Sequence, residues 1–325
     1  MTTTLDPTAL YGPVGADLPL IDEMLMSLRH VEFPWLRHML DATLSGGGKR
    51  LRPAIALLAG RLGDYDLGKL VPLAASVELL HTATLIHDDV IDAAQERRGK
   101  PTATALFNNA SSVMLGDYMF ANAAEFVART ENIRVIRNFA ETLRVMANGE
   151  LIQDMSAFEY SPDMQRYFDR IYGKTASLFA TAAEGGAIVT GAPEDVVAPM
   201  RSFGEHLGIA FQIVDDILDF SATSEELGKP AGSDLLSGTL TLPALLYMER
   251  YPDDNPVRRA FDGTRRRANL ARAVEEIRAS DILEESMTTA RRFATDAQLA
   301  LANIPAGEPR ATLEGLVEYV LSRRS

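Results

Sequence analysis

Two groups of three aspartates have the spacing of a metal site. Both follow the pattern Asp-Asp-x-x-Asp: the first cluster is Asp88, Asp89 and Asp92, and the second cluster is Asp215, Asp216 and Asp219. In a helix, the first and last aspartate of each cluster share a face. Three carboxylates at the C-terminal end of a helix repel one another and oppose the helix dipole. Oxygen ligands without imidazole or thiolate are typical of Mg²⁺. A solvated helix end is the alternative for either cluster alone, but the repetition favours bound metal.

Basic segments supply the counter-charge for a phosphorylated ligand. The segment 46–53 joins three glycines to Lys49, Arg50 and Arg52, and a proline suited to a first helical turn follows. The segment 97–101, Arg-Arg-Gly-Lys-Pro, comes shortly after the first cluster. Backbone N–H groups and guanidinium groups of this kind bind diphosphates. Segment 46–53 is not a Walker loop, because the glycine spacing and the Lys-Ser/Thr pair are missing. Each segment taken alone could also be a solvated loop.

Further polar residues lie near the clusters. Lys174 and Thr175 interrupt an apolar helical segment, where a lysine is costly unless it is paired or reaches the surface. Gln212 lies three residues before the second cluster, and Lys229 follows it in a glycine-containing loop. His81 is either a hydrogen-bonded core histidine or a donor to a phosphate.

Helices must position these groups. Nearly every long segment has apolar residues at three- and four-residue spacing, and no sustained alternation of β-branched residues occurs. The clearest examples are 21–44, 72–92, 165–187, 193–219 and 270–301. Leu73–Ile86 is apolar on most of its circumference, which is typical of a helix inside a large bundle. We predict an all-α protein, with a loosely ordered leader at 1–20 and a single domain at 21–325.

Composition excludes several classes of protein. The chain has 325 residues, of which 46% are hydrophobic and 24% charged, as in ordinary globular proteins. The net charge of −13 argues against nucleic-acid binding, and the absence of cysteine excludes disulfides and thiolate chemistry. The first 28 residues contain no Lys or Arg, unlike a targeting segment. Charges interrupt the apolar runs before they could span a bilayer. We expect a cytoplasmic protein without a transmembrane segment.

From about Leu44 to Pro243, the chain resembles the trans-type (head-to-tail) isoprenyl diphosphate synthases. The resemblance rests on the ordered runs Gly-Gly-Lys-Arg-Leu-Arg-Pro, Leu-Ile-His-Asp-Asp-Val-Ile-Asp, Arg-Arg-Gly-Lys-Pro-Thr, Gly-Lys-Thr-Ala, Phe-Gln-Ile-Val-Asp-Asp-Ile-Leu-Asp and Thr-Leu-Pro. It implies the isoprenoid-synthase helical bundle around a central cavity and a homodimer. The implied reaction condenses isopentenyl diphosphate with an allylic diphosphate to give an all-trans polyprenyl diphosphate.

The resemblance also implies residue roles. Three Mg²⁺ ions, or Mn²⁺ in their place, would bridge the two clusters through the allylic diphosphate. The implied metal ligands are Asp88, Asp89, Asp92, Asp215 and Asp219, with Asp216 supporting them. The implied isopentenyl diphosphate ligands are Lys49, Arg52, His81 and Arg98. The implied allylic diphosphate ligands are Arg97, Lys174, Thr175, Gln212 and Lys229. Thr239 stands where many members have lysine, so one phosphate contact is expected to be weaker.

The length of the product depends on residues before the first cluster. In this family, an aromatic residue four or five positions before the first aspartate gives short products, whereas Ala83 and Thr84 are small. Together with Leu80, these two small residues would leave a tunnel open for the growing prenyl product. We therefore expect a product of about six to ten isoprene units. A facing residue such as Met114, Tyr118 or Met119 would set the depth. A geranylgeranyl-length product remains an alternative.

Two other functions fit a related fold. A class I terpene cyclase has one Asp-rich motif and a different second metal pattern, and it has no use for Lys49 and Arg52. A non-catalytic subunit of a heteromeric prenyl synthase would have lost aspartates or arginines, and this chain has lost none of those named above.

Overall fold

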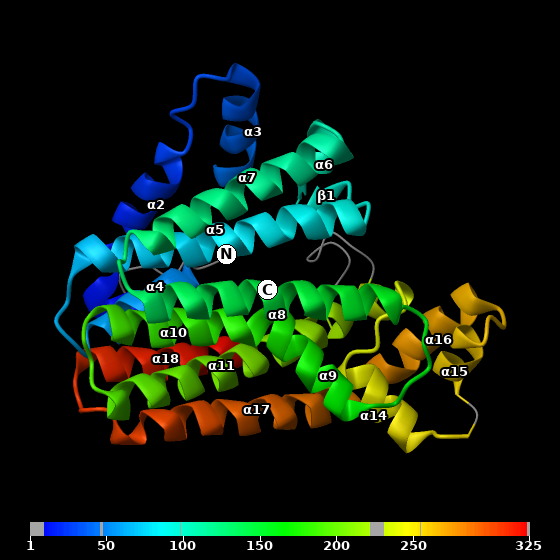
Figure 1. The fold of residues 1–325 in the computed structure, drawn as a ribbon. Coiled ribbons are helices and arrows are strands. Elements are labelled where there is room, and N and C mark those ends of the chain that lie inside the picture. The colour runs from blue at the N-terminus through cyan, green and yellow to red at the C-terminus, as the bar shows by residue number, and fades with distance from the viewer. Residues whose placement is uncertain (1–9, 46–47, 98, 222–230, 254, 324–325) are drawn as a thin grey trace, which may run out of the picture. The chain divides into compact units, whose positions relative to one another are not determined.

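Figure 1 shows the fold in a computed structural model, which describes residues 10–45, 48–97, 99–221, 231–253 and 255–323. In these residues, the regular structure is helical apart from one short hairpin. The hairpin pairs β1 (Glu96–Arg97) with β2 (Lys100–Pro101) in antiparallel register. The all-α prediction is therefore confirmed.

The chain packs as two compact units. The first comprises the residues up to Leu143 with Leu178–Gly204 and Ala300–Leu316, and the second comprises Arg144–Ser177, Glu205–Leu299 and the residues from Val317. Mainly in the first unit lie η1 (Gly12–Val14), α2 (Leu18–Ser27), α3 (Pro34–Leu44), α4 (Leu51–Gly60), α5 (Leu67–Ile91), α6 (Ala103–Leu106), α7 (Asn109–Ala128), α10 (Ser177–Val189) and η3 (Leu301–Asn303). Mainly in the second lie α9 (Met164–Ile171), the π-helix η2 (Tyr172–Ala176), α13 (Ser233–Leu236), α14 (Leu242–Arg250), α15 (Pro256–Phe261), α16 (Arg266–Arg278) and α17 (Ile282–Ala300). Three helices have more than one turn in each unit: α8 (Ile133–Met155), α11 (Glu194–Ser221) and α18 (Glu308–Ser322).

Side-chain caps fix where several site-bearing helices begin. Asp66 accepts a hydrogen bond from the backbone N–H of Gly68 at the start of α5. Asn108 caps α7 in the same way, and Asp163 caps α9. Each cap satisfies a backbone N–H that the first turn of a helix leaves without a partner.

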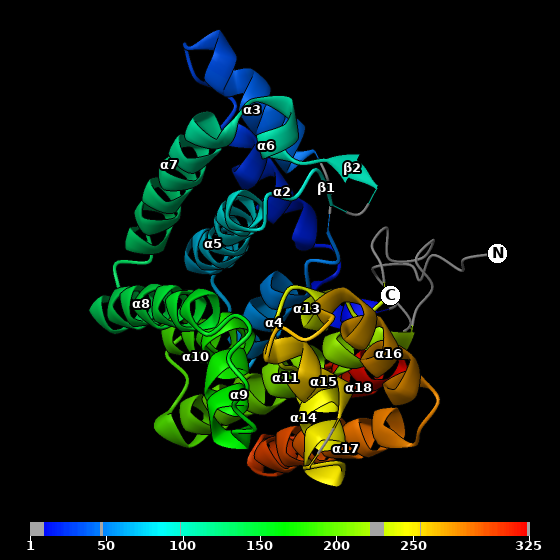
Figure 2. The ribbon, with the colours of Figure 1, turned by 90° about the vertical axis from the view of Figure 1, so that its right-hand side faces the viewer.

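Helix α5 is the central element of the first unit. Fourteen of its residues are buried, and they lie on all its faces, as the sequence predicted for Leu73–Ile86. It packs along α7, and Figures 1 and 2 show the two helices side by side. By length and composition α5 could cross a membrane, but 72% of its apolar window is buried in the protein, as in the core helix of a globular domain. Its burial places the first aspartate cluster at the end of a well-packed rod.

The core of the second unit holds the second cluster. Ile213, Ile217 and Phe220 of α11 pack against Tyr167 of α9 and against α14 and α16. These apolar positions alternate with the aspartates along α11. One face of α11 is therefore anchored in the core, and Asp216 and Asp219 beside it are themselves buried.

Several segments differ in detail from the sequence prediction. The segment 21–44 forms two helices, because Pro34 begins a new helix at α3. The segment 165–187 is divided by the π-helix η2, and 270–301 is divided near Ser280. Within the predicted leader, residues 10–20 include η1 and a buried Tyr11, whose hydroxyl donates to the carbonyl of Lys49. This part is more ordered than expected, whereas a single domain over 21–325 stays a prediction.

Candidate functional site

The first aspartate cluster lies at the C-terminal end of α5. Asp88 and Asp89 belong to the last turn, and Asp92 is the C-cap, whose N–H donates to the Asp88 carbonyl at 2.8 Å. Asp89 is buried and Asp92 is exposed. The apolar pattern of α5 continues to Ile86, so the helix carries its acidic residues directly out of the core. This placement matches the predicted helix end.

Arg97 is the partner of Asp89. Arg97 lies in the β1–β2 hairpin, and its Nε donates to Asp89 Oδ1 at 2.8 Å. Burial raises the pKa of Asp89, and the positive charge of Arg97 opposes that rise. A residue predicted to bind diphosphate thus contacts a residue predicted to bind metal. Arg98, which the sequence analysis also assigned to diphosphate, lies outside the described residues.

The three cations of the basic segment have different environments. Arg50 donates through Nε to Asp22 at 2.8 Å and through Nη1 to Glu78 at 2.7 Å. Although burial alone would lower it, these two carboxylates raise the pKa of Arg50. Lys49 is exposed, and the guanidinium carbon of Arg52 lies 4.5 Å from the centre of the Phe179 ring. Arg50 therefore ties the loop to α2 and α5.

The Arg50 tether places demands on the backbone. Arg50 has a φ of 50°, a left-handed conformation that costs energy in a residue with a side chain. A Cβ at Gly48 would lie 3.4 Å from Glu78 Oε1 and 3.3 Å from Arg50 Nη1, so glycine leaves room for the ion pair. Gly46 and Gly47 lie outside the described residues. The ion pairs hold a strained turn from which Lys49 projects.

The predicted chain-length residues occupy one stretch of α5. Leu80 and Ala83 are fully buried, and Thr84 is partly buried with its hydroxyl donating to the His81 carbonyl at 2.8 Å. His81 itself is partly buried. On α7, Met119 is fully buried, whereas Met114 is 67% exposed. Of these two methionines, Met119 is therefore the one placed inside the first unit.

Asp216 of the second cluster is buried within the second unit. Tyr167 donates its hydroxyl to Asp216 Oδ2 at 2.7 Å, and Gln212 Nε2 donates to Oδ1 at 2.9 Å. Burial raises the pKa of Asp216 to about 7, the charge of Asp234 adds to the rise, and these two hydrogen bonds oppose it. Thr175 in turn donates to Gln212 Oε1 at 2.6 Å. Three residues assigned from the sequence, Thr175, Gln212 and Asp216, thus form one chain of contacts.

The other two aspartates of the second cluster also have protein partners. Asp219 accepts from the Ser233 hydroxyl at 2.7 Å and from the Asp234 N–H at 3.2 Å, which fixes the start of α13. Asp215 Oδ1 lies 2.9 Å from Nη2 of Arg323, which directly follows α18. Each carboxylate is therefore already oriented by the protein.

Lys174 lies in the π-helix η2. Its Nζ is 2.7 Å from Glu150 Oε1 of α8, and both side chains are partly exposed. The backbones of Gly149 and Gly173 approach closely at this point, since a Cβ at Gly149 would lie 3.8 Å from the Gly173 Cα. A π-helix inserts one residue into a helical turn and often marks a functional site. Lys229 lies outside the described residues.

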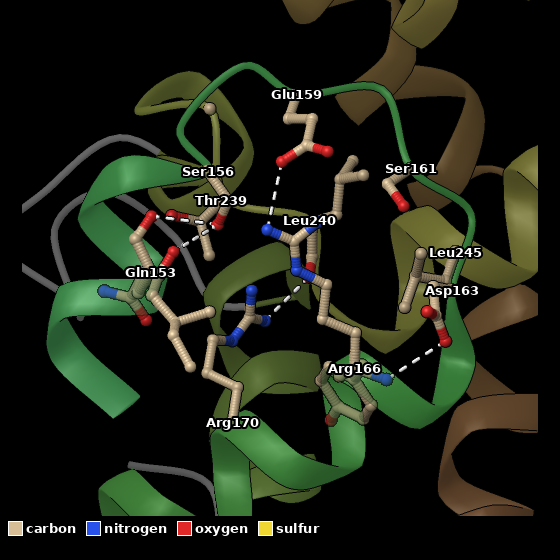
Figure 3. Close-up of a pocket in the computed structure, with 13 residues that line it drawn as sticks. Gln153, Ser156, Glu159, Ser161, Asp163, Arg166, Arg170, Thr239, Leu240 and Leu245 are labelled. Atoms are coloured by element: carbon tan, nitrogen blue, oxygen red, sulfur yellow. Dashed lines mark hydrogen bonds and ion pairs between the residues drawn. The ribbon is translucent and has the colours of Figure 1, made fainter. Parts of the chain in front are cut away.

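Figure 3 shows a pocket in the second unit that contains Thr239. Arg170 lines the same pocket and donates to the Leu240 carbonyl at 2.7 Å. Arg166 lines it too and pairs with Glu159 at 3.0 Å. Thr239 therefore lines a pocket to which two arginines also contribute.

The two clusters suit magnesium by their chemistry. All five assigned ligands are carboxylates, and hard oxygen donors are what this ion prefers. In the part of the chain that the structure describes, no three His, Asp or Glu side chains converge into a ready-made site. Magnesium typically takes one or two carboxylates and completes its shell with water and substrate phosphates. The donor set therefore fits a site that is completed by a diphosphate.

Sequence reasoning missed several residues around these groups. Tyr167 lies seven positions before Lys174, two helical turns away on the same side, and that spacing could have indicated it. Glu78 could have been noticed because it is an acidic residue in an otherwise mostly apolar part of α5. Arg323 carried no local signal, because its partner Asp215 is distant in the sequence.

Comparison with known proteins gives one consistent result. The sequence profile of the polyprenyl synthetase family matches residues 33–277. A prenyl transferase of Synechocystis sp. is 40% identical over 98% of this chain and 99% of its own. Heptaprenyl diphosphate synthase component 2 of Geobacillus stearothermophilus is 38% identical over 97% and 98%. A polyprenyl synthase of Caulobacter crescentus, complexed with calcium and isoprenyl diphosphate, is 36% identical and covers 97% of both chains with a TM-score of 0.91.

Proposed function

Because this chain belongs to the polyprenyl synthetase family and is a prenyltransferase that joins isopentenyl diphosphate head-to-tail to an allylic diphosphate, we propose that its two aspartate clusters bind Mg²⁺ and hold the allylic diphosphate. The observation that carries this proposal is the set of oriented carboxylates at the end of α5 and along α11. Without a bound cation, three acids on one helical stretch would be mutually repulsive.

The residues around the clusters fit the ionisation of an allylic diphosphate. Bound magnesium would withdraw charge from the diphosphate and so ease cleavage of the allylic C–O bond. Lys174 and Arg97 would add positive charge at the leaving group. Gln212 donates from its amide nitrogen to Asp216 and accepts from the Thr175 hydroxyl on its amide oxygen. These two hydrogen bonds would hold in place the face of α11 that meets the diphosphate.

The second substrate would bind at the basic segment of the first unit. We assign isopentenyl diphosphate to Lys49, Arg52 and His81, with Arg50 holding the loop. The new C–C bond forms as the alkene attacks the allylic carbon, and the departing diphosphate accepts the proton that the product loses. This scheme needs no separate general base.

We assign a medium or long product to this chain, about six to ten isoprene units, on the argument from tunnel sterics. Ala83 and Thr84 have small side chains about one turn before the first cluster, and Leu80 lies one turn earlier in α5. The buried Met119 of α7 is our candidate for the far wall. A heptaprenyl product, as in the name of the Geobacillus relative, falls within this range.

We infer that a second copy of the chain covers an apolar face of the first unit. Its exposed residues are Phe33 and Trp35 at the start of α3, Leu106 of α6, and Val113 and Met114 of α7. The relative named component 2 favours an alternative, in which a different subunit covers this face. Light scattering of the purified chain distinguishes the two, since a homodimer has twice the mass of the chain.

One assay tests the proposed function. Purified protein is incubated with Mg²⁺, radiolabelled isopentenyl diphosphate and a farnesyl or geranylgeranyl primer, and the products are sized after dephosphorylation. We expect a ladder of elongated products from the wild type and from the control variant Asp169→Asn, whose carboxylate contacts only Gln165 among the described residues. Asp88→Asn should abolish elongation. Release of diphosphate without isopentenyl diphosphate would instead indicate a cyclase, and activity only with an added partner would indicate a subunit.

A further inference from the structure

Arg323 places a guanidinium group against the second aspartate cluster. It follows α18 directly, its side chain is only 9% exposed, and its Nη2 lies 2.9 Å from Asp215 Oδ1. Its guanidinium carbon lies 4.1 Å from the centre of the Phe211 ring. Phe211 and Asp215 are four residues apart on α11 and therefore share a face. The aromatic ring and the carboxylate together hold the cation on that face.

Apart from the pair with Asp215, the guanidinium has no hydrogen-bond partner in the described part of the chain. Its Nε–H and Nη1–H groups are buried and donate to no acceptor there. A buried cation with incomplete hydrogen bonding is costly, and removing its single counter-charge would cost more. The position of Arg323 therefore depends on the negative charge of Asp215.

The positive charge of Arg323 opposes the binding of a metal ion to Asp215. Asp215 is assigned above as a magnesium ligand, and a divalent ion on its carboxylate would lie within a few ångströms of the guanidinium. The repulsion between them is partly screened, since Asp215 is 35% exposed, but it acts at short range. A diphosphate brings several negative charges, which reverse the balance and allow both cations to stay.

We propose that Arg323 is an internal counter-ion of the second cluster, which holds one oxygen of Asp215 and keeps the cluster from binding a divalent ion tightly until a diphosphate is also present. This inference rests on the proposed function, and it adds an order of events. Metal binding at the second cluster is coupled to the substrate, and the coupling is set by a residue at the end of α18. Arg323 acts through Asp215 and is thus a positioning residue.

Direct metal binding tests the proposal without relying on turnover. Mn²⁺ serves as the probe, and its free concentration is followed by electron paramagnetic resonance, with and without inorganic pyrophosphate. Two neutral variants, Arg323→Met and Arg323→Gln, are compared so that a packing defect in one does not decide the result. We expect both to bind Mn²⁺ about ten-fold more tightly than the wild type without pyrophosphate, as removal of a nearby unit charge predicts. With pyrophosphate the difference should shrink to within about two-fold.

Three further variants serve as controls. Arg323→Lys keeps the charge and should bind Mn²⁺ like the wild type. Arg272→Met removes a guanidinium from the exposed pair with Glu276 and should leave Mn²⁺ affinity unchanged. In the Asp215→Asn background, adding Arg323→Met should no longer tighten binding. Circular dichroism in EDTA checks that each variant is folded.

The outcomes separate this inference from the proposed function. If neither neutral variant binds Mn²⁺ more tightly than the wild type, or if Arg323→Lys tightens binding as much as they do, the counter-ion role is wrong. If the wild type binds no Mn²⁺ even with pyrophosphate, the metal site of the proposed function fails instead.

Discussion

Replacing Asp216 with asparagine should stabilise the metal-free protein while impairing its reaction. The carboxylate is buried, and its pKa is raised from 3.8 to about 7. Each unit of pKa corresponds to about 1.4 kcal/mol, so keeping Asp216 charged above pH 7 costs up to about 4 kcal/mol. Asparagine keeps the shape and can still bond to Tyr167 and Gln212, but it carries no charge.

The sign of the pH dependence follows from the raised pKa. Between about pH 4 and pH 7, folded Asp216 retains a proton that the unfolded chain has released. Its contribution to stability is fully present below the unfolded pKa and is lost as the pH rises through the folded pKa. The wild type should therefore lose stability relative to Asp216→Asn over this range, and the gap should be largest near pH 8. Mg²⁺ with pyrophosphate should narrow the gap, because added positive charge favours the ionised carboxylate.

The assay is urea unfolding in EDTA at about pH 5 and pH 8, followed by circular dichroism. Asp169→Asn, which removes an exposed carboxylate of α9, is the matched control and should shift neither midpoint. Elongation activity of Asp216→Asn is measured in parallel and should fall. If Asp216→Asn is no more stable than the wild type at pH 8, the carboxylate is not held charged at a cost, and the account of its environment is wrong.

Three further predictions concern substrate binding and product length. Glu78→Gln removes the buried negative charge that pairs with Arg50 and should lower the free energy of unfolding in urea by about 2 kcal/mol. It should also raise the KM for isopentenyl diphosphate with little change in kcat. An unchanged KM would contradict the role of Arg50 in holding the loop. Ala83→Phe should shorten the radiolabelled products, whereas an unaltered ladder would place the tunnel wall elsewhere. Thr239→Lys should lower the KM for the allylic primer, and an unchanged KM would contradict a place for Thr239 beside the allylic diphosphate.

The helices and their order were predictable because the apolar spacing of this chain is strong. The central helix α5 and the two acidic helix ends follow directly from it. Helix boundaries were harder to place, since Pro34 and Ser280 interrupt an apolar pattern that continues on both sides. The division of 165–187 by a π-helix carries no sequence signal that we can identify, because one inserted residue leaves the composition unchanged.

The chemistry of the site was readable from the sequence, but its partners were not. Spacing alone grouped Gln212 with the second cluster, because residues three or four positions apart lie on the same face of a helix. No spacing relates Arg323 to Asp215 or Arg50 to Glu78, because these pairs depend on tertiary packing. The resemblance assigned Lys49 and Arg52, but not Arg50, to isopentenyl diphosphate, and only the structure shows that Arg50 pairs with Asp22 and Glu78.

The central claim is that both aspartate clusters act on one diphosphate through bound magnesium. A crystal structure with Mg²⁺ and an unreactive allylic thiolodiphosphate tests it most directly. We predict carboxylate oxygens of Asp88 or Asp92 and of Asp215 at about 2.1 Å from ions that bind the same diphosphate. Ions held by one cluster alone, or a diphosphate bound away from either cluster, would contradict the account.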